Sequence, residues 1–241
     1  MPRTEPPLDT QALIFARELA ELHALRRAYE RLLPASLDPQ DSRLAAVTVR
    51  TATALFTDLR GFTRITERFA DDPARLLAIV NEHLAAVVGT ITRCGGVVEK
   101  FVGDGVLATF GARADLPDHR ERALSAALGA VSANEALNRR RSPEWGFRLE
   151  VGVGAAAGKL VVGRIGPPER SELGVLGDPI NVAARLVAQA GAGEVLLEAD
   201  VYRSLAGSVR ADVLGSVAVR GRTGEVEAYR IALLGAPAQG G

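Results

Sequence analysis

Two stretches of the sequence decide the fold, FTDLRGFT at residues 56–63 and KFVGDGVLATFG at residues 100–111. The first closes a run rich in Val, Thr, Ala and Leu, which is typical of a buried strand, and its glycine opens a helical pattern. In the second, two glycines flank Asp104 between two apolar runs, and glycine accepts the positive φ that a short hairpin turn needs. We therefore expect Asp58 and Asp104 where neighbouring strands of one sheet end.

Two carboxylates placed in this way can hold divalent metal ions. Side chains on neighbouring strands can bind two cations ~3.5–4 Å apart, an arrangement suited to in-line displacement at phosphorus. Magnesium accepts one or two carboxylates and completes its shell with phosphate oxygens and water. The alternative interpretation makes Asp58 a helix N-cap and Asp104 an ordinary turn residue. For the two residues together, in these contexts, the metal site is the better hypothesis.

The same segments resemble the class III nucleotide cyclases, the catalytic domain of adenylate and guanylate cyclases. The resemblance runs from about Ala45 to Leu234. The family pattern F-x-D-[IL]-x-G-F-T matches residues 56–63, and K-x-x-G-D matches residues 100–104. A third block, LGDPINVAARL at residues 176–186, is similar to G-[DN]-x-V-N-x-A-[AS]-R. Three blocks in the family's order make the resemblance specific.

This resemblance implies a reaction and an assembly. The reaction is conversion of ATP to 3′,5′-cyclic AMP and pyrophosphate, by in-line attack of the ribose 3′-hydroxyl on the α-phosphorus. Asp58 and Asp104 would bind two Mg²⁺ or Mn²⁺ ions per site, and Asn181 and Arg185 would act as the transition-state residues. In the family these two pairs come from opposite subunits. A homodimer with two equal sites at its interface is therefore implied.

The spacing of Asn181 and Arg185 supports a polar face on one helix. The pattern predicts a helix over residues 178–189, in which residues four apart lie one turn above each other. Arginine presents a rigid fork of donors that matches phosphate oxygens, and asparagine can bond a ribose oxygen. The alternative is an exposed Asn and Arg on an ordinary amphipathic helix. The preceding Gly-Asp pair and the family match favour the functional interpretation.

The choice of base depends on two positions. The resemblance places Lys100 against adenine, and it places Gly174 where adenylate cyclases usually carry Asp or Thr. Because Gly174 has no side chain, one of two expected base contacts is missing. A guanylate enzyme would more often carry Glu in place of Lys100. We therefore expect ATP as the substrate, with GTP as the alternative.

Further contacts to the triphosphate are expected from the backbone and from cations. The turn after Asp58 opens a helix, where free N–H groups attract anions. This turn offers Leu59, Gly61, Phe62 and Thr63. Three cations near predicted strand ends resemble triphosphate-binding positions of cyclases, although ordinary surface cations would look the same. They are Lys159, Arg220 and Arg222.

Composition limits the classes of partner. The 241-residue chain carries 29 basic and 29 acidic side chains, so its net charge favours neither nucleic acid nor an anionic membrane. The single cysteine, Cys94, cannot form an internal disulfide, and three scattered histidines give no zinc-ligand spacing. No uninterrupted apolar run reaches the ~20 residues of a membrane-spanning helix. We expect a cytoplasmic protein that binds no nucleic acid and has no membrane span.

We divide the chain into residues 1–42, 43–235 and 236–241. The first segment shows a heptad-like apolar stripe that ends at Pro34, followed by a linker. It predicts a helix that forms a short parallel coiled coil or packs on its own domain. In similar cyclases such a helix joins the catalytic domain to an upstream sensor partner. The middle segment is the predicted catalytic domain, and the last is a tail.

The coarse pattern predicts an α+β, ferredoxin-like (palm-type) domain, a mostly antiparallel sheet with helices covering one face. The second face would be left for a partner. Two other functions stay open: a catalytically silent, cyclase-like regulatory or dimerisation module, and a diguanylate cyclase. The latter requires a GG[DE]EF-like turn, which GGVVEKFVGDG does not supply. The predicted strands are 47–56, 97–102, 106–110, 147–154, 159–165, 195–198, 216–219 and 227–233, and the predicted helical regions are 63–93 with a break near Asp72, 118–140 and 178–189.

Overall fold

The computed structural model describes residues 47–167, 171–205, 209–218 and 225–231. The chain divides into two compact units, and all described residues belong to the second, Val47–Gly241. The predicted N-terminal helix and linker at 1–42, the tail at 236–241, Arg220 and Arg222 lie outside the described residues.

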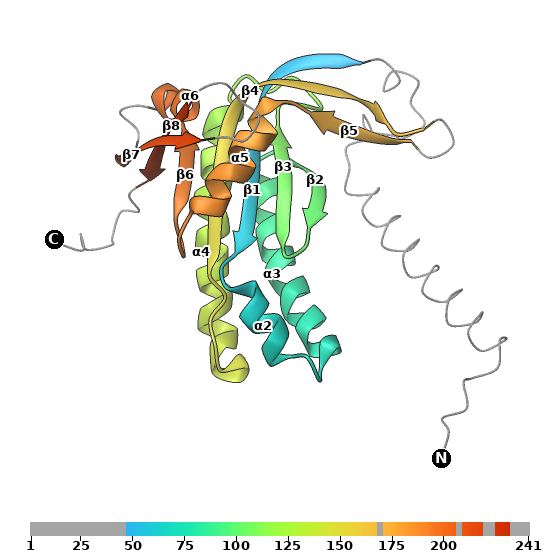
Figure 1. The fold of residues 1–241 in the computed structure, drawn as a ribbon, viewed down its shortest axis with the longest axis vertical. Helices are drawn as coiled ribbons and strands as arrows, with labels where there is room; N and C mark the ends of the chain where they lie inside the picture. The colour runs from blue at the N-terminus through green and yellow to red at the C-terminus, as the bar shows by residue number, and fades with distance from the viewer. Residues whose placement is uncertain (1–46, 168–170, 206–208, 219–224, 232–241) are drawn as a thin grey trace. The chain divides into compact units, whose positions relative to one another are not determined.

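The core of the described unit is a βαββαβ arrangement (Figure 1). Its first four strands pair in the order β2-β3-β1-β4, and all three pairings are antiparallel. This is the predicted ferredoxin-like core. The elements are β1 (Thr48–Leu59), α2 (Phe62–Arg68), α3 (Pro73–Arg93), β2 (Val97–Val102), β3 (Gly105–Phe110), α4 (His119–Trp145) and β4 (Val151–Ile165).

The remaining elements extend the sheet beyond β4. Strand β6 pairs with β4 in parallel, and β8 and β7 follow antiparallel, so the whole sheet is mixed. Strand β5 pairs with the last part of β4, which runs on as one strand where the sequence predicted two. These elements are β5 (Glu172–Leu176), α5 (Asp178–Gln189), β6 (Val195–Glu198), α6 (Ala199–Ser204), β7 (Ala211–Ala218) and β8 (Glu225–Ile231).

Helices lie on both faces of the sheet, whereas the sequence predicted coverage of one face. Figure 1 shows α3 and α4 behind the sheet and α5 in front of it. Side chains alternate between faces along a strand. On β4, Val153 and Ala155 belong to the apolar cluster under α3 and α4, and Ala156 belongs to the cluster under α5. At Gly154 a Cβ would overlap the α5 backbone, so glycine lets this helix approach the sheet closely.

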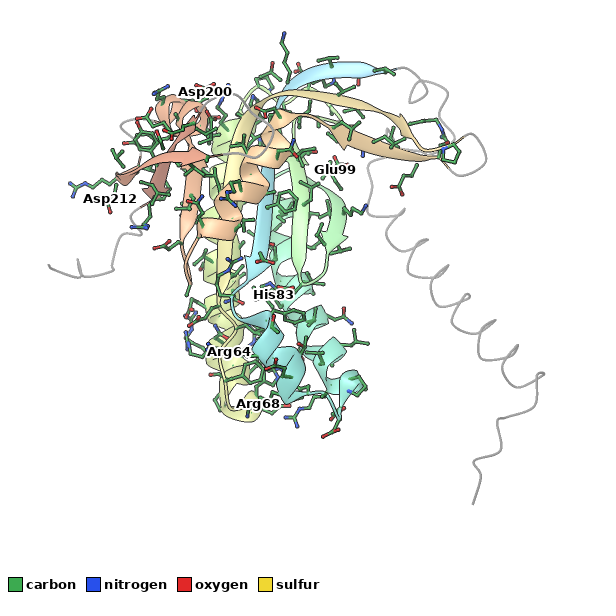
Figure 2. All side chains as sticks on the ribbon, in the orientation of Figure 1. Arg64, Arg68, His83, Glu99, Asp200 and Asp212 are labelled. Carbon is green, nitrogen blue, oxygen red and sulfur yellow. The ribbon has the colours of Figure 1, made fainter. Side chains whose placement is uncertain are left out.

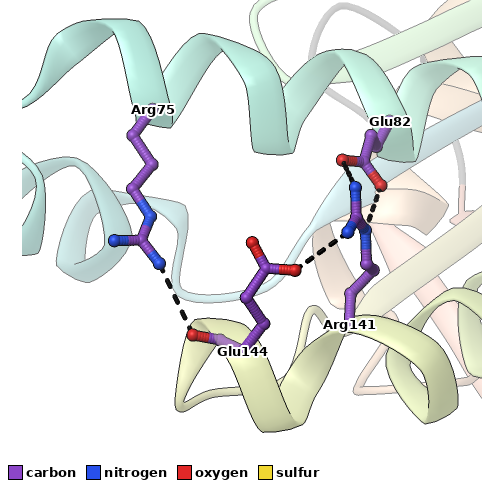
Figure 3. Close-up of polar contacts among 4 residues, drawn as sticks. All are labelled: Arg75, Glu82, Arg141 and Glu144. Atoms are coloured by element: carbon purple, nitrogen blue, oxygen red, sulfur yellow. Dashed lines mark hydrogen bonds and ion pairs between the residues drawn. The ribbon is translucent and has the colours of Figure 1, made fainter.

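Helices α3 and α4 are joined by buried apolar contacts and by polar contacts at their edge. Figure 3 shows Arg141 of α4 between Glu82 of α3 and Glu144, with Nε donating to Glu82 at 2.7 Å. Arg75 donates to the Glu144 carbonyl oxygen at 3.4 Å. Exposed ion pairs of this kind contribute about 0–1 kcal/mol each. The larger stabilisation therefore comes from the apolar core beneath them.

Helix α3 alone, among the described helices, is long and apolar enough to cross a membrane by length and composition. Its Ile79, Val87 and Ile91 are buried in the core against the sheet and α4. A core helix meets the same criterion, and 33% of the most apolar stretch of α3 is buried inside the described structure.

Candidate functional site

The ends of β1 and β3 are tied together by backbone and side-chain bonds. Thr57 pairs with Val106, and the Val106 N–H donates to the Thr57 Oγ1 at 3.2 Å. A Cβ on Gly105 would overlap the Thr57 carbonyl oxygen, so only glycine allows this close approach. Gly103 has a φ of 61°, the left-handed region that the sequence pattern predicts for this turn. The strand ends that carry the two aspartates are therefore adjacent and fixed.

Asp104 is buried in the turn between β2 and β3. Its Oδ2 accepts a hydrogen bond from the Leu59 N–H at 2.9 Å, which crosses from β3 to β1. A charged acceptor makes such a bond stronger than a neutral one. This bond holds the Asp104 carboxylate at the end of β1, beside Asp58.

Asp58 is half-exposed at the same corner and forms an ion pair with Arg60. Burial raises the pKa of the Asp58 carboxyl, and the nearby negative charge of Asp104 raises it further, while Arg60 opposes both effects. Two carboxylates that repel one another in this way attract a cation that can bind both. They provide oxygen ligands only, which fits Mg²⁺ or Mn²⁺ with phosphate and water completing the shell.

No group of three His, Cys, Asp or Glu side chains suited to a metal occurs among the described residues. The corner that contains Asp58 and Asp104, which we call the metal corner, therefore fits a metal that depends on the substrate for part of its ligands. Magnesium bound through one or two carboxylates and a triphosphate meets this description.

In the turn after Asp58, two of the backbone N–H groups that were predicted to be free are hydrogen-bonded. The Leu59 N–H is bonded to Asp104, and the Arg60 N–H donates to the Glu150 carbonyl oxygen at 2.6 Å. The prediction of a free N–H at Leu59 is therefore wrong, because the buried Asp104 carboxylate takes that donor, while contact between Leu59 and the triphosphate stays a prediction. Gly61 has a φ of 67° and precedes the seven-residue helix α2. Gly61, Phe62 and Thr63 stay predictions for triphosphate contact.

A buried histidine lies behind the metal corner. His83 of α3 is fully buried, and its Nδ1 is 3.0 Å from the Asn134 Oδ1 of α4 (Figure 2). The Asn134 side-chain amide donates to the Leu149 carbonyl oxygen at 2.7 Å, so its oxygen accepts from His83. Burial lowers the pKa of His83, although the Asn134 bond and the Asp104 charge oppose this shift. Neutral His83 is thus part of the packing beneath the site.

Helix α5 places Asn181 and Arg185 on its exposed side. Its Val182, Ala183 and Leu186 are buried against β4 and β6. Asn181 and Arg185 are four residues apart on the solvent side, as predicted from their spacing. The Arg185 Nε donates to the Ala218 carbonyl oxygen at 3.1 Å, while the rest of its guanidinium faces outward.

Pairing across the sheet places Lys100 on the same face as α5. Lys100 pairs with Leu107 of β3, and Leu107 pairs with Phe56 of β1. Phe56 packs against the apolar cluster under α5. Residues paired across antiparallel strands share a face, and Asp58 follows Phe56 by two positions. Lys100, Asp58 and α5 are therefore presented on one face.

The other predicted substrate residues are more scattered. Gly174 lies in β5 opposite Gly163, and no hydrogen bond or ion pair joins it to Lys100 within the described part of the chain. Lys159 is exposed on β4 opposite Thr51.

Sequence reasoning missed three residues near the site: Arg60, Glu99 and Arg113. Arg60 could have been suspected because it follows Asp58 by two positions in the first motif, and it also donates to the Ala190 carbonyl oxygen at 3.3 Å. Glu99 and Arg113 form a buried ion pair near Lys100. No local sequence pattern predicts that pair, because the two residues are 14 positions apart in the sequence.

Comparison with known proteins agrees with this geometry. The family model for the adenylate and guanylate cyclase catalytic domain matches residues 44–232. An adenylate cyclase of Anabaena cylindrica is 31% identical over 192 residues, which cover 74% of this chain but 37% of that protein. This chain thus spans less than two-fifths of that relative.

Two solved structures of similar fold differ in their named activity. The guanylyl cyclase Cya2 is 28% identical with a TM-score of 0.72, covering 80% of this chain and 96% of the other. The adenylyl cyclase CyaB from P. aeruginosa is 26% identical with a TM-score of 0.70, covering 78% and 96%.

Proposed function

Because the chain belongs to the adenylate and guanylate cyclase catalytic domain family, a family of lyases that make cyclic nucleotides, we propose that it converts ATP to 3′,5′-cyclic AMP and pyrophosphate. The observation that carries this proposal is the metal corner. There Asp58 and Asp104 stand at the ends of two hydrogen-bonded strands, and burial together with the Asp104 charge raises the pKa of Asp58. Such a pair fits a metal-dependent reaction at a triphosphate.

Asp58 and Asp104 would hold two Mg²⁺ or Mn²⁺ ions. When bound, these ions would supply Lewis-acid polarisation of the reacting oxygens and neutralise charge on the departing pyrophosphate. The chain contributes a fixed geometry: Asp104 is anchored by the Leu59 N–H, and Asp58 must exchange its ion pair with Arg60 for metal.

The chemical step is an intramolecular displacement. The ribose 3′-hydroxyl oxygen forms a bond to the α-phosphorus as the bond to the bridging oxygen of the β-phosphate breaks. The hydroxyl proton passes to solvent, and pyrophosphate leaves. Arg185 would stabilise the charge that grows on the α-phosphate, and Asn181 would orient the ribose. Lys159, Arg220 and Arg222 are proposed as cations for the leaving phosphates.

We propose a homodimer because the chain leaves its site open. Asn181 and Arg185 face solvent, and an apolar row crosses three strands on the opposite face of the sheet. Val49 pairs with Val161, which pairs with Leu176, and these side chains are 59%, 37% and 57% exposed. A row of this kind is costly to leave in water. A second copy that supplies the other half of each site must dock on the face that carries Asp58 and α5, and covering this row would need a further contact with a partner.

ATP is the proposed substrate because Lys100 suits adenine. A guanylate or dual-specificity cyclase is the second candidate, since Gly174 offers no side chain to the base and the similar Cya2 is a guanylyl cyclase. We also propose a cytoplasmic location, based on the nucleotide substrate and the unpaired Cys94, and control by an upstream sensor partner.

The test is to identify the product by mass after incubating the purified protein with ATP or GTP and Mg²⁺ or Mn²⁺. Cyclic AMP in excess over cyclic GMP supports the proposal. Cyclic GMP in excess supports the second candidate. Absence of any cyclic nucleotide, from protein shown to be folded, would favour a catalytically silent module.

A further inference from the structure

Arg113 joins the two segments that carry the base-reading positions. Its Nε donates to the Glu99 Oε1 at 3.1 Å, and its Nη2 pairs with the Glu99 Oε2. The same Nη2 donates to the Leu173 carbonyl oxygen of β5 at 3.3 Å. Glu99 precedes Lys100 and Leu173 precedes Gly174. One guanidinium therefore connects the neighbours of both residues that we assign to the base.

Glu99 is also the extra residue of a β-bulge. Val98 pairs with Ala108, but Lys100 pairs with the next residue, Leu107, so Glu99 has no partner in the register. A bulge re-aims the side chains that follow it. In a regular strand Lys100 would instead pair with Val106, whose side chain is buried on the α3 and α4 face. The bulge thus brings Lys100 to the face that carries Asp58 and α5.

The bulge is held by contacts to the Glu99 side chain, which Figure 2 labels on β2. Besides Arg113, the Thr109 Oγ1 donates to the Glu99 Oε1 at 2.6 Å. The Glu99 and Arg113 side chains are only 5% and 8% exposed. A buried ion pair often adds little net stability compared with apolar residues of the same volume. Its presence here is explained better by the geometry that it imposes.

Strand β5 depends on the same guanidinium. Since Gly174 has no side chain, β5 can offer the base only backbone groups, whose placement depends on the whole strand. The bond from Arg113 to the Leu173 carbonyl oxygen fixes β5 relative to the bulge on β2. Arg113 therefore bonds both to the residue before Lys100 and to the residue before Gly174.

We propose that Arg113, acting through Glu99 and Leu173, is a positioning residue for the purine base and sets the preference between ATP and GTP. This inference rests on the proposed function, because it takes Lys100 and Gly174 as the base-reading positions. Arg113 itself would touch no substrate.

The test uses two variants and one control in the 241-residue chain. Arg113→Lys keeps the charge but cannot bond to Glu99 through a fork and to Leu173 at once. The double variant Glu99→Met/Arg113→Met removes both charges together, so neither is left buried and unpaired. Arg148→Lys is the matched control, because Arg148 forms an exposed ion pair with Glu135 elsewhere on the surface.

Each protein is assayed for turnover with ATP and GTP, and for displacement of a fluorescent ATP analogue by each nucleotide without turnover. We expect both variants to raise KM for ATP about tenfold while kcat changes less, a loss of binding rather than of chemistry. The ratio of kcat/KM for ATP to that for GTP should move toward one by about threefold or more. Arg148→Lys should match the wild type.

The displacement assay separates this inference from the proposed function. If the wild type makes no cyclic nucleotide but binds ATP and GTP with a preference that the variants lose, the proposed function fails and this inference stands. If the variants keep the wild-type preference, while only their thermal stability falls, Arg113 is structural and the inference is wrong. A wild type without any preference would also overturn it.

Discussion

The metal corner and the exposed side of α5 are built in opposite ways. At the metal corner, Asp104 is buried and bonded to the Leu59 N–H, and Asp58 is paired with Arg60. On α5, Arg185 makes one bond to the Ala218 carbonyl oxygen, and Asn181 makes none within the described part of the chain. Buried groups with hydrogen-bonding partners are held in place, whereas the exposed Asn181 and Arg185 side chains have most of their hydrogen-bonding groups available to a ligand. The chain thus holds the carboxylates of the metal corner in fixed positions and leaves the polar side chains of α5 exposed to solvent.

The largest expected effect comes from removing a carboxylate at the metal corner. Asp58→Ala should reduce kcat by about a hundredfold or more, because charge stabilisation by the metal is worth several kcal/mol. Asp104→Ala should do the same but also leave the Leu59 N–H unpaired. Asp104→Asn is the matched variant, since its amide oxygen can still accept that bond. All three are measured as turnover with ATP and Mg²⁺, beside a melting curve.

Asp104→Asn distinguishes chemistry from folding. We expect it to melt near the wild-type temperature and to be nearly inactive. Near-normal turnover in either Asp58→Ala or Asp104→Asn would contradict the metal assignment.

Arg185→Ala tests the role of the exposed side of α5. We expect kcat to fall by about a hundredfold with a smaller change in KM, as when a donor that acts on transition-state charge is lost. Stability should change by less than about 0.5 kcal/mol, because the side chain is exposed. Gln189→Ala, at an exposed position of the same helix, is the control. A loss of stability with unchanged kcat would make Arg185 structural.

The buried His83, behind the metal corner, should make the stability of the fold depend on pH. Burial lowers the pKa of His83 in the folded chain. Below pH about 6.5 the unfolded chain therefore binds a proton at this histidine, whereas the folded chain binds it only at a lower pH. Stability should therefore be full above pH about 6.5 and fall as the pH decreases toward the folded pKa. In His83→Leu, we expect this acid loss to be smaller, because the group that binds the proton only in the unfolded chain is removed. Urea unfolding across this range measures it, and equal slopes in both proteins would contradict it.

The smallest effect is expected at Gly174. The wild type should prefer ATP over GTP modestly, and Gly174→Thr should sharpen that preference about threefold to tenfold by adding a hydrogen-bonding group. Gly174 is not in the left-handed region, but a Cβ there would overlap the Ile165 side chain, which must turn away. Gly174→Ala adds the same Cβ without the hydroxyl and should leave the ATP:GTP ratio unchanged. Equal ATP:GTP ratios in Gly174→Thr and Gly174→Ala would contradict the assignment of Gly174 to the base-binding site.

The parts of the fold that local sequence determines were predicted well. Strand β2 and helix α5 have the predicted bounds, and the break at Asp72–Pro73 separates α2 from α3 because Asp72 caps α3 through the Arg75 N–H. In each case the deciding signal is a glycine, a proline or an apolar period within a few residues.

The parts that depend on distant pairing were not predicted. Strand β5 is held by its register with β4, and α5 reaches the second face only because Gly154 on a distant strand admits it. The Leu59 N–H was predicted to be free because nothing near it in sequence accepts it; its partner, Asp104, is 45 residues away. The bulge at Glu99 likewise depends on Arg113, which lies beyond the hairpin.

The central claim is that one chain supplies the metal corner and another supplies α5 to the same site. Mixing inactive Asp58→Ala with inactive Arg185→Ala tests it directly, with exchange of subunits verified by mass or fluorescence. A mixed dimer contains one site built from two undamaged halves, so at equal amounts about a quarter of wild-type activity should return. No recovery despite verified exchange would contradict the account, because each chain would then carry a complete site of its own.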